Sequence, residues 1–172
     1  MQEFTNEIIP LEKLPKYQEI SLNSPHKNYW KVIVINLSIF LLFIAGALTA
    51  LILLNNKIQP YANYLIGAVL LGAVLLFILF KASFKKRGFA LREKDIVYKS
   101  GIIAETTTII PLNRIQHVAL NEGIFSRFYG LATLQIYTAG GQSGHLRIAG
   151  IPVESAKVIK EALIKKIDLF AN

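Results

Sequence analysis

Two long stretches without a charged residue dominate the sequence. Residues 32–54 carry no charge for 23 positions, and residues 61–80 carry none for 20. As α-helices they would be about 35 Å and about 30 Å long, and a bilayer core is about 30 Å thick. Helices of soluble proteins are usually shorter than this. The two stretches therefore predict a membrane protein with a hairpin of two transmembrane helices.

The distribution of basic residues predicts how the hairpin is oriented. The turn at residues 55–60 contains Pro60 and is too short to hold a domain, so both chain ends lie on one side. The turn has one basic residue, Lys57, whereas the other flanks of the hairpin have six. The positive-inside rule predicts cytoplasmic termini. The six flanking residues are Lys27, Lys31, Lys81, Lys85, Lys86 and Arg87.

Small residues four positions apart, Gly46 with Ala50 and Ala68 with Gly72, are typical of spans that pack closely. The alternative is that glycine and alanine are simply common in such helices. Asn36 could line a polar path, but a hydrogen bond back to its own helix is the favoured interpretation.

The rest of the chain divides into a polar N-terminal arm, residues 1–31, and a C-terminal domain, residues 85–172. The arm has no apolar core of a signal peptide, so we expect the first span to act as an uncleaved anchor. From residue 81 onward there are fourteen basic and seven acidic residues. This excess predicts contact with anionic lipids of the bilayer. Nucleic acid is an unfavoured partner, because no nucleic-acid-binding motif or long basic helix is present.

In the C-terminal domain the apolar pattern changes to a period of two and then to a helical period. We expect an α+β arrangement, in which a bent antiparallel β-sheet or barrel is capped by a C-terminal helix; the family resemblance given below implies that this arrangement is PH-like. Ile124, Phe125 and Phe128 are expected to face inward from a short helical turn. Strands are expected near residues 89–91, 96–98, 102–111, 115–120, 131–138 and 145–149. The apolar face of the helix is expected to consist of Ala156, Ile159, Leu163, Ile167 and Phe170.

Four short segments resemble the membrane-flanked, YdbS-like family of bacterial pleckstrin-homology (PH) domains. They are residues 110–118 (IPLNRIQHV), 127–131 (RFYGL), 137–141 (YTAGG) and 149–151 (AGI). The resemblance implies two spans followed by a seven-stranded, strongly bent sheet with a terminal helix. It also implies the bacterial cytoplasmic (inner) membrane and, as a partner, a larger multi-span protein with several such domains. The loop at 140–144 lacks the basic cluster with which many eukaryotic relatives bind inositol phosphates.

The candidate binding residues are basic or polar side chains near strand and helix ends. The cluster 85–87 can hold anionic headgroups or only fix topology. Arg114 and Gln116 can bind a phosphate or a partner's carboxylate, or tie a strand end to its loops. Arg127 can bind a ligand or fix the turn before Gly130. The complete set of lipid- or partner-binding candidates is Lys85, Lys86, Arg87, Arg114, Gln116 and Arg127.

No catalytic or cofactor motif is present in the sequence. His26, His117 and His145 are scattered, there is no cysteine, and no nucleophile elbow or phosphate-binding loop occurs, so we expect no metal or cofactor. The hypothesis is a non-catalytic, membrane-anchored module that binds a membrane-protein partner, anionic lipid headgroups, or both. A homo-oligomer stays open. The alternatives are a lipid-acting enzyme and a small transport or channel subunit, the latter disfavoured because the spans have no ionisable residue.

Overall fold

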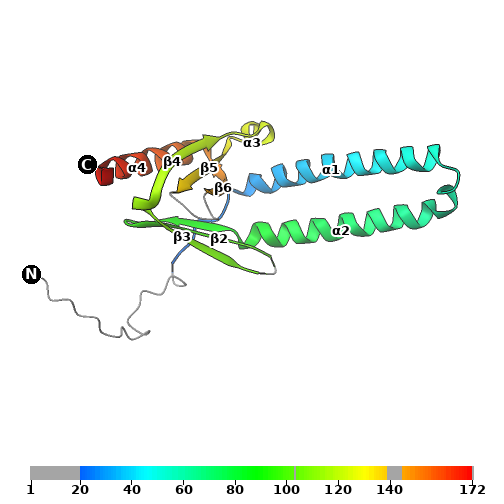
Figure 1. Cartoon of the computed structure of the whole chain (residues 1–172), viewed down its shortest axis with the longest axis horizontal. Helices are drawn as coiled ribbons and strands as arrows, with labels where there is room; N and C mark the ends of the chain where they lie inside the picture. Colours follow the sequence, from blue (N-terminus) through cyan, green and yellow to red (C-terminus); the bar gives the residue numbers. More distant parts are fainter. Residues whose placement is uncertain (1–19, 103, 139–144, 172) are drawn as a thin grey trace, which may run out of the picture.

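The computed structural model describes residues 20–102, 104–138 and 145–171, with side chains as far as residue 167 in the last segment. Most of the predicted N-terminal arm, the loop at 140–144 and the side chain of Phe170 therefore lie outside the described residues. Two long helices extend side by side from one end of a β-rich domain (Figure 1). They are α1 (Lys27–Leu54) and α2 (Ala62–Lys86), joined through the 3-10 turn η3 (Gln59–Tyr61).

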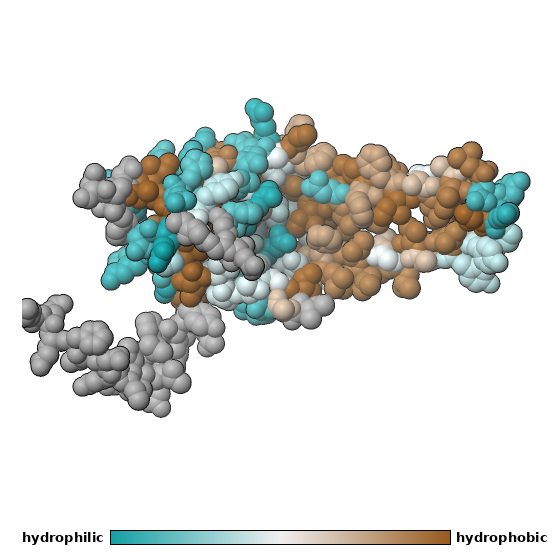
Figure 2. All heavy atoms as spheres, viewed as in Figure 1, coloured by the Kyte–Doolittle hydropathy of each residue, from teal (hydrophilic) through white to brown (hydrophobic). Residues whose placement is uncertain are grey.

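Both long helices have the length and composition needed to cross a membrane. Their most apolar windows are 6% and 0% buried inside the protein, so these side chains have no protein core to pack into. A core helix of a soluble protein would be mostly buried, whereas lipid covers the surface of a transmembrane helix. Figure 2 shows this apolar surface in brown along both helices on the face in view. The predicted apolar hairpin is confirmed.

Aromatic side chains hold the two helices together at the ends near the β-domain. The ring centroid of Trp30 lies 5.3 Å from that of Phe77 and 5.9 Å from that of Phe84. Of the two interpretations of the small residues, the structure favours simple abundance at the glycines, because a Cβ added at Gly46 or Gly72 would meet nothing within 4 Å.

The β-domain, residues 88–171, consists of two three-stranded antiparallel sheets and a C-terminal helix, which confirms the predicted α+β, PH-like class. The described residues form six strands, whereas the family resemblance implied seven. Register shifts at Ile115/His117 and Ala132/Thr133 interrupt the second sheet, and such irregularities bend strands. The elements are β1 (Gly88–Leu91), β2 (Asp95–Ser100), β3 (Thr106–Pro111), η4 (Leu112–Arg114), β4 (Ile115–Asn121), α3 (Ile124–Phe128), β5 (Leu131–Thr138), β6 (His145–Pro152) and α4 (Val153–Ala171).

Helix α4 covers the core of the β-domain, as its apolar period predicts. Ala156 and Leu163 are almost fully buried, and Ile159 and Ile167 pack partly buried against the same core. Alternate residues of the central strands face this helix and the opposite sheet, which matches the predicted period of two. The fully buried side chains include Ile96, Leu134, Ile136, Ile148 and Ile151.

The helical hairpin is attached to the β-domain through both of its chain ends. Only Arg87 separates the last residue of α2 from the first residue of β1. Before α1, the His26 backbone N–H donates to the Gly150 carbonyl at 2.8 Å, and Asn23 exchanges two backbone hydrogen bonds with Phe89. A Cβ added at Gly150 would lie 2.6 Å from the Tyr29 ring. These contacts make a fitted junction between α1 and β6.

Candidate functional site

The predicted basic cluster at residues 85–87 does not form one patch, because its three side chains enter three different environments. Successive residues on a helix point about 100° apart. Lys85 lines a small pocket between the helix ends, Lys86 contacts the β2–β3 loop, and Arg87 lines a groove between the helices.

Three lysines surround a pocket of about 200 Å³ where α1 begins and α2 ends. Lys27 comes from the first turn of α1, and Lys81 and Lys85 lie four residues apart on one face of α2. Trp30 and Phe84 supply the apolar part of the lining, and no carboxylate is among the lining residues. The pocket, here called the lysine pocket, can accommodate a small anion. Sequence reasoning used Lys27 and Lys81 only for topology; the four-residue spacing of Lys81 and Lys85 was the available signal.

Lys86 is paired within the protein. Its Nζ lies 3.0 Å from Glu105 Oε1 and donates to the Ile102 carbonyl at 3.2 Å. Lys99 Nζ lies 2.7 Å from the other carboxylate oxygen of Glu105. The hydrogen bond from Lys99, and next that from Lys86, hold the pKa of Glu105 below its ordinary value. Lys86 thus links the end of α2 to the loop before β3.

Arg87 lies at the end of a groove of about 520 Å³ between α1 and α2. Its Nη2 donates to the buried hydroxyl of Ser83 at 3.2 Å. Its Nε is buried and has no hydrogen-bond partner. Burial raises the pKa of nearby Tyr98, although the charge of Arg87 acts in the opposite direction. The groove is lined by Tyr29, Ile33, Asn36, Leu37, Phe40, Leu76, Phe80 and Arg87.

The favoured interpretation of Asn36 is confirmed. Its side-chain nitrogen donates to the Val32 carbonyl at 2.9 Å, one turn back along α1. One of the two side-chain N–H donors is therefore used within its own helix.

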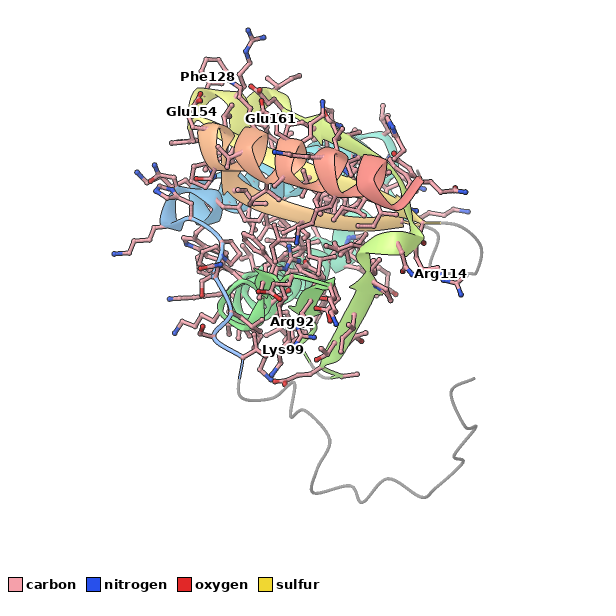
Figure 3. The ribbon with its side chains drawn as sticks, turned by 90° about the vertical axis from the view of Figure 1, so that its left-hand side faces the viewer. Arg92, Lys99, Arg114, Phe128, Glu154 and Glu161 are labelled. Atoms are coloured by element: carbon pink, nitrogen blue, oxygen red, sulfur yellow. The ribbon has the colours of Figure 1, made fainter. Side chains whose placement is uncertain are left out.

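Arg114 and Gln116 lie far from the lysine pocket and from the groove at Arg87, at the junction of β3 and β4. Figure 1 places this junction at the end of the β-domain away from the helical hairpin, and Figure 3 shows Arg114 there, projecting from the edge of the domain. Both side chains are exposed. They can contact a molecule in solution or another protein, but not one at the level of the helix ends.

Helix α3 presents Arg127 together with two apolar side chains. Ile124 and Phe128 are 76% and 83% exposed, so the expectation that they face inward is wrong, whereas Phe125 is half-buried. Glu122, Ile124, Arg127 and Phe128 line a shallow hollow of about 660 Å³. Figure 1 shows α3 on the edge of the domain that faces the helical hairpin. The cation of Lys31 lies 5.7 Å from the centroid of the Tyr129 ring and joins α1 to this edge.

The described residues contain no group of three or more His, Cys, Asp or Glu side chains arranged to hold a metal ion. Tyr137 lies between the rings of His117 and His145, at centroid distances of 5.7 Å and 6.1 Å. General acid–base catalysis needs a titratable group within hydrogen-bond reach of its partner. The features brought together at the helix ends are cationic groups and apolar surfaces.

Comparisons with known proteins agree with this architecture. The family described as "Bacterial PH domain" matches residues 32–167. The chain is 30% identical over 115 residues to the UPF0699 transmembrane protein YdbT of Bacillus subtilis (strain 168), a match that covers 65% of the chain and 22% of YdbT. It is 39% identical over 83 residues to the UPF0699 transmembrane protein YdbS of the same organism, covering 46% of the chain and 52% of YdbS. The matches thus span about a fifth and about half of these relatives. No solved structure matches the chain.

Proposed function

The chain belongs to the bacterial PH domain family, and from this premise we propose that it is a non-catalytic module, anchored in the bacterial cytoplasmic membrane, that binds anionic lipid headgroups at the inner leaflet. The lysine pocket is the observation that carries the proposal. It joins three cations from two helix ends to an aromatic lining, without a carboxylate.

The depth of the lysine pocket supports a lipid headgroup as its ligand. Its lysines flank the charge-free stretches of α1 and α2, where a bilayer core ends. Tryptophan favours this interfacial depth, and each basic residue near an anionic membrane surface contributes about 1 kcal/mol of attraction. The aromatic rings support the headgroup region and the lysines bind its phosphate.

We assign both termini and the β-domain to the cytoplasm in a chain that crosses the membrane twice. The six basic residues at the domain-proximal ends, against Lys57 in the distal turn, support this orientation. The chain has no cysteine, so a cysteine introduced at Lys57 is the sole target of a thiol reagent. Labelling of this cysteine in intact cells by an impermeant reagent supports the orientation, and protection of it contradicts the orientation.

Trp30 is the only tryptophan in the chain and lies in the lysine pocket, so its fluorescence can report the local lipid composition. In vesicles of phosphatidylcholine and phosphatidylglycerol, we expect quenching to be stronger when the phosphatidylglycerol carries bromine than when the phosphatidylcholine does. The triple variant Lys27→Gln, Lys81→Gln, Lys85→Gln should reduce this difference several-fold, since it removes about 3 kcal/mol of surface attraction at most.

Lys57→Gln is the matched control for the Trp30 measurement, because it removes a lysine at the opposite end of the hairpin. It should leave the difference between the two brominated lipids unchanged. Equal quenching by both lipids in the wild-type protein would contradict headgroup selection by the lysine pocket.

The second candidate function is binding of a larger membrane protein with several PH-like domains. The exposed pair Arg114 and Gln116 supports it, because this end of the β-domain lies away from the helix ends. YdbT carries sequence well beyond the region that matches this chain, as such a partner would. Cross-linked affinity purification from native membranes distinguishes this partner from a homo-oligomer and from lipid alone.

A further inference from the structure

We propose that the groove between α1 and α2 holds one phospholipid of the inner leaflet, with an acyl chain along the groove and the phosphate bound by Arg87. This inference rests on the proposed function in that it assumes a membrane-anchored module that binds lipid. It adds a second site, separate from the lysine pocket, because Tyr29, Arg87 and the other groove residues are not among those that line the pocket.

The groove has the length and direction of an acyl chain in one leaflet. Its lining residues on α1 recur at spacings of three and four, as do Leu76 and Phe80 on α2, so each helix contributes one face. From Leu76 to Arg87 the chain rises about 16 Å, which is about half of a bilayer core of about 30 Å. Leu76 lies four residues, or about 6 Å, inside the end of the charge-free stretch of α2, and Arg87 lies beyond that end. The groove therefore runs from the apolar part of the inner leaflet to the level of its headgroups.

The chemistry changes along the groove in the same order as in a phospholipid. Its deeper part is lined by Phe40, Leu76 and Phe80, whereas Tyr29 and Arg87 lie at the end near the β-domain. One N–H of the Asn36 side chain donates to the Val32 carbonyl within its own helix. The groove thus matches an apolar chain with an anion at one end.

Arg87 is built to bind an anion at this end. Its Nε is buried without a hydrogen-bond partner, and a buried unsatisfied donor is unfavourable. Its Nη2 is fixed by Ser83, which restricts the orientation of the guanidinium. Guanidinium groups bind phosphate oxygens through two N–H donors. Arg87 lines the end of the groove, so a phosphate there would accept from the terminal N–H groups that do not contact Ser83.

The dimensions favour a lipid chain over a protein helix. A volume of about 520 Å³ spread along the groove leaves a channel narrower than an α-helix, which is about 10–12 Å across with its side chains. Figure 2 shows openings between the two apolar helices toward the turn, where a Cβ added at Gly46 or Gly72 would meet nothing within 4 Å. A single hydrocarbon chain can enter sideways from the leaflet.

A photoactivatable phosphatidylglycerol with a diazirine in its acyl chain tests this site in the full chain reconstituted in vesicles. We expect Phe40 and Leu76 in the groove to be labelled several-fold more than Phe43 and Leu71, which are among the most exposed residues of the same helices. Arg87→Gln should lower labelling of the groove about tenfold, the change expected when a charged hydrogen bond is lost.

Two further variants separate loss of the site from loss of the fold. Leu76→Phe narrows the groove without changing Arg87 and should also reduce labelling, while circular dichroism shows the β-domain intact. Lys85→Gln is the matched control, because it removes a neighbouring charge from the lysine pocket, and it should leave groove labelling unchanged. Equal labelling of groove and lipid-facing residues, or unchanged labelling in Arg87→Gln, overturns the inference.

The two lipid proposals fail in different measurements. The absence of an anionic preference at Trp30 in the wild-type protein contradicts headgroup selection by the lysine pocket, and groove labelling is read independently. Preferential groove labelling that depends on Arg87 supports the present inference in either case. Uniform labelling together with anionic selection at Trp30 overturns the groove and leaves the proposed function supported.

Discussion

Replacing Gly150 with alanine should lower the free energy of unfolding of the β-domain by about 2 to 5 kcal/mol. Gly150 has φ of +82°, a backbone conformation that is strained for residues with a Cβ. The added Cβ would also lie 2.6 to 2.9 Å from three carbon atoms of Tyr29. Chemical denaturation of the full chain in mild detergent, followed by circular dichroism, measures the change.

Gly130 provides the matched control for the substitution at Gly150. It has φ of +62°, but a Cβ there meets nothing within 4 Å, so Gly130→Ala should show the backbone strain alone, about 1 to 2 kcal/mol. Adding Tyr29→Ala to Gly150→Ala should remove the steric part of the loss. Equal losses for the two glycine variants would contradict a fitted junction between α1 and β6.

Replacing Leu163 with alanine should destabilise the β-domain by about 2 to 5 kcal/mol. This side chain of α4 is 1% exposed and belongs to the core cluster, so its removal leaves a cavity where the helix packs on the sheets. Thermal unfolding of the full chain in detergent should show a lower midpoint.

The next residue of α4 supplies the control for Leu163→Ala. Ile164 is 40% exposed, so Ile164→Ala should change stability by no more than about 1 kcal/mol. A similar loss in both variants would contradict the packing of α4 as the cap of the core.

The hairpin and the fold class could be predicted from the sequence because each depends on a local pattern. A small protein cannot cover the surface of an apolar helix of twenty or more residues, so lipid is the favourable environment for such a helix. Alternating apolar residues at Leu134, Ile136, Leu146 and Ile148 specify which faces of two strands are buried, and the structure has all four inside.

The arrangement of the candidate site could not be predicted, because it depends on how distant segments meet. Lys85, Lys86 and Arg87 are adjacent in sequence, but the helical rotation and the docking of the β-domain direct them to three places. Lys27 joins Lys81 and Lys85 only through the register of the hairpin. The outward direction of Ile124 and Phe128 likewise follows from the position of α3 beside the helix ends.

The single residue between α2 and β1 limits where the β-domain can act. A domain on a long flexible linker can move through a large volume, whereas a one-residue connection keeps this β-domain next to the membrane surface. A macromolecule that binds the β-domain must therefore itself extend to the membrane surface. In a thinner bilayer the helices tilt, and the β-domain turns with them. The orientation that the β-domain presents to a binding partner therefore depends on the thickness of the surrounding bilayer.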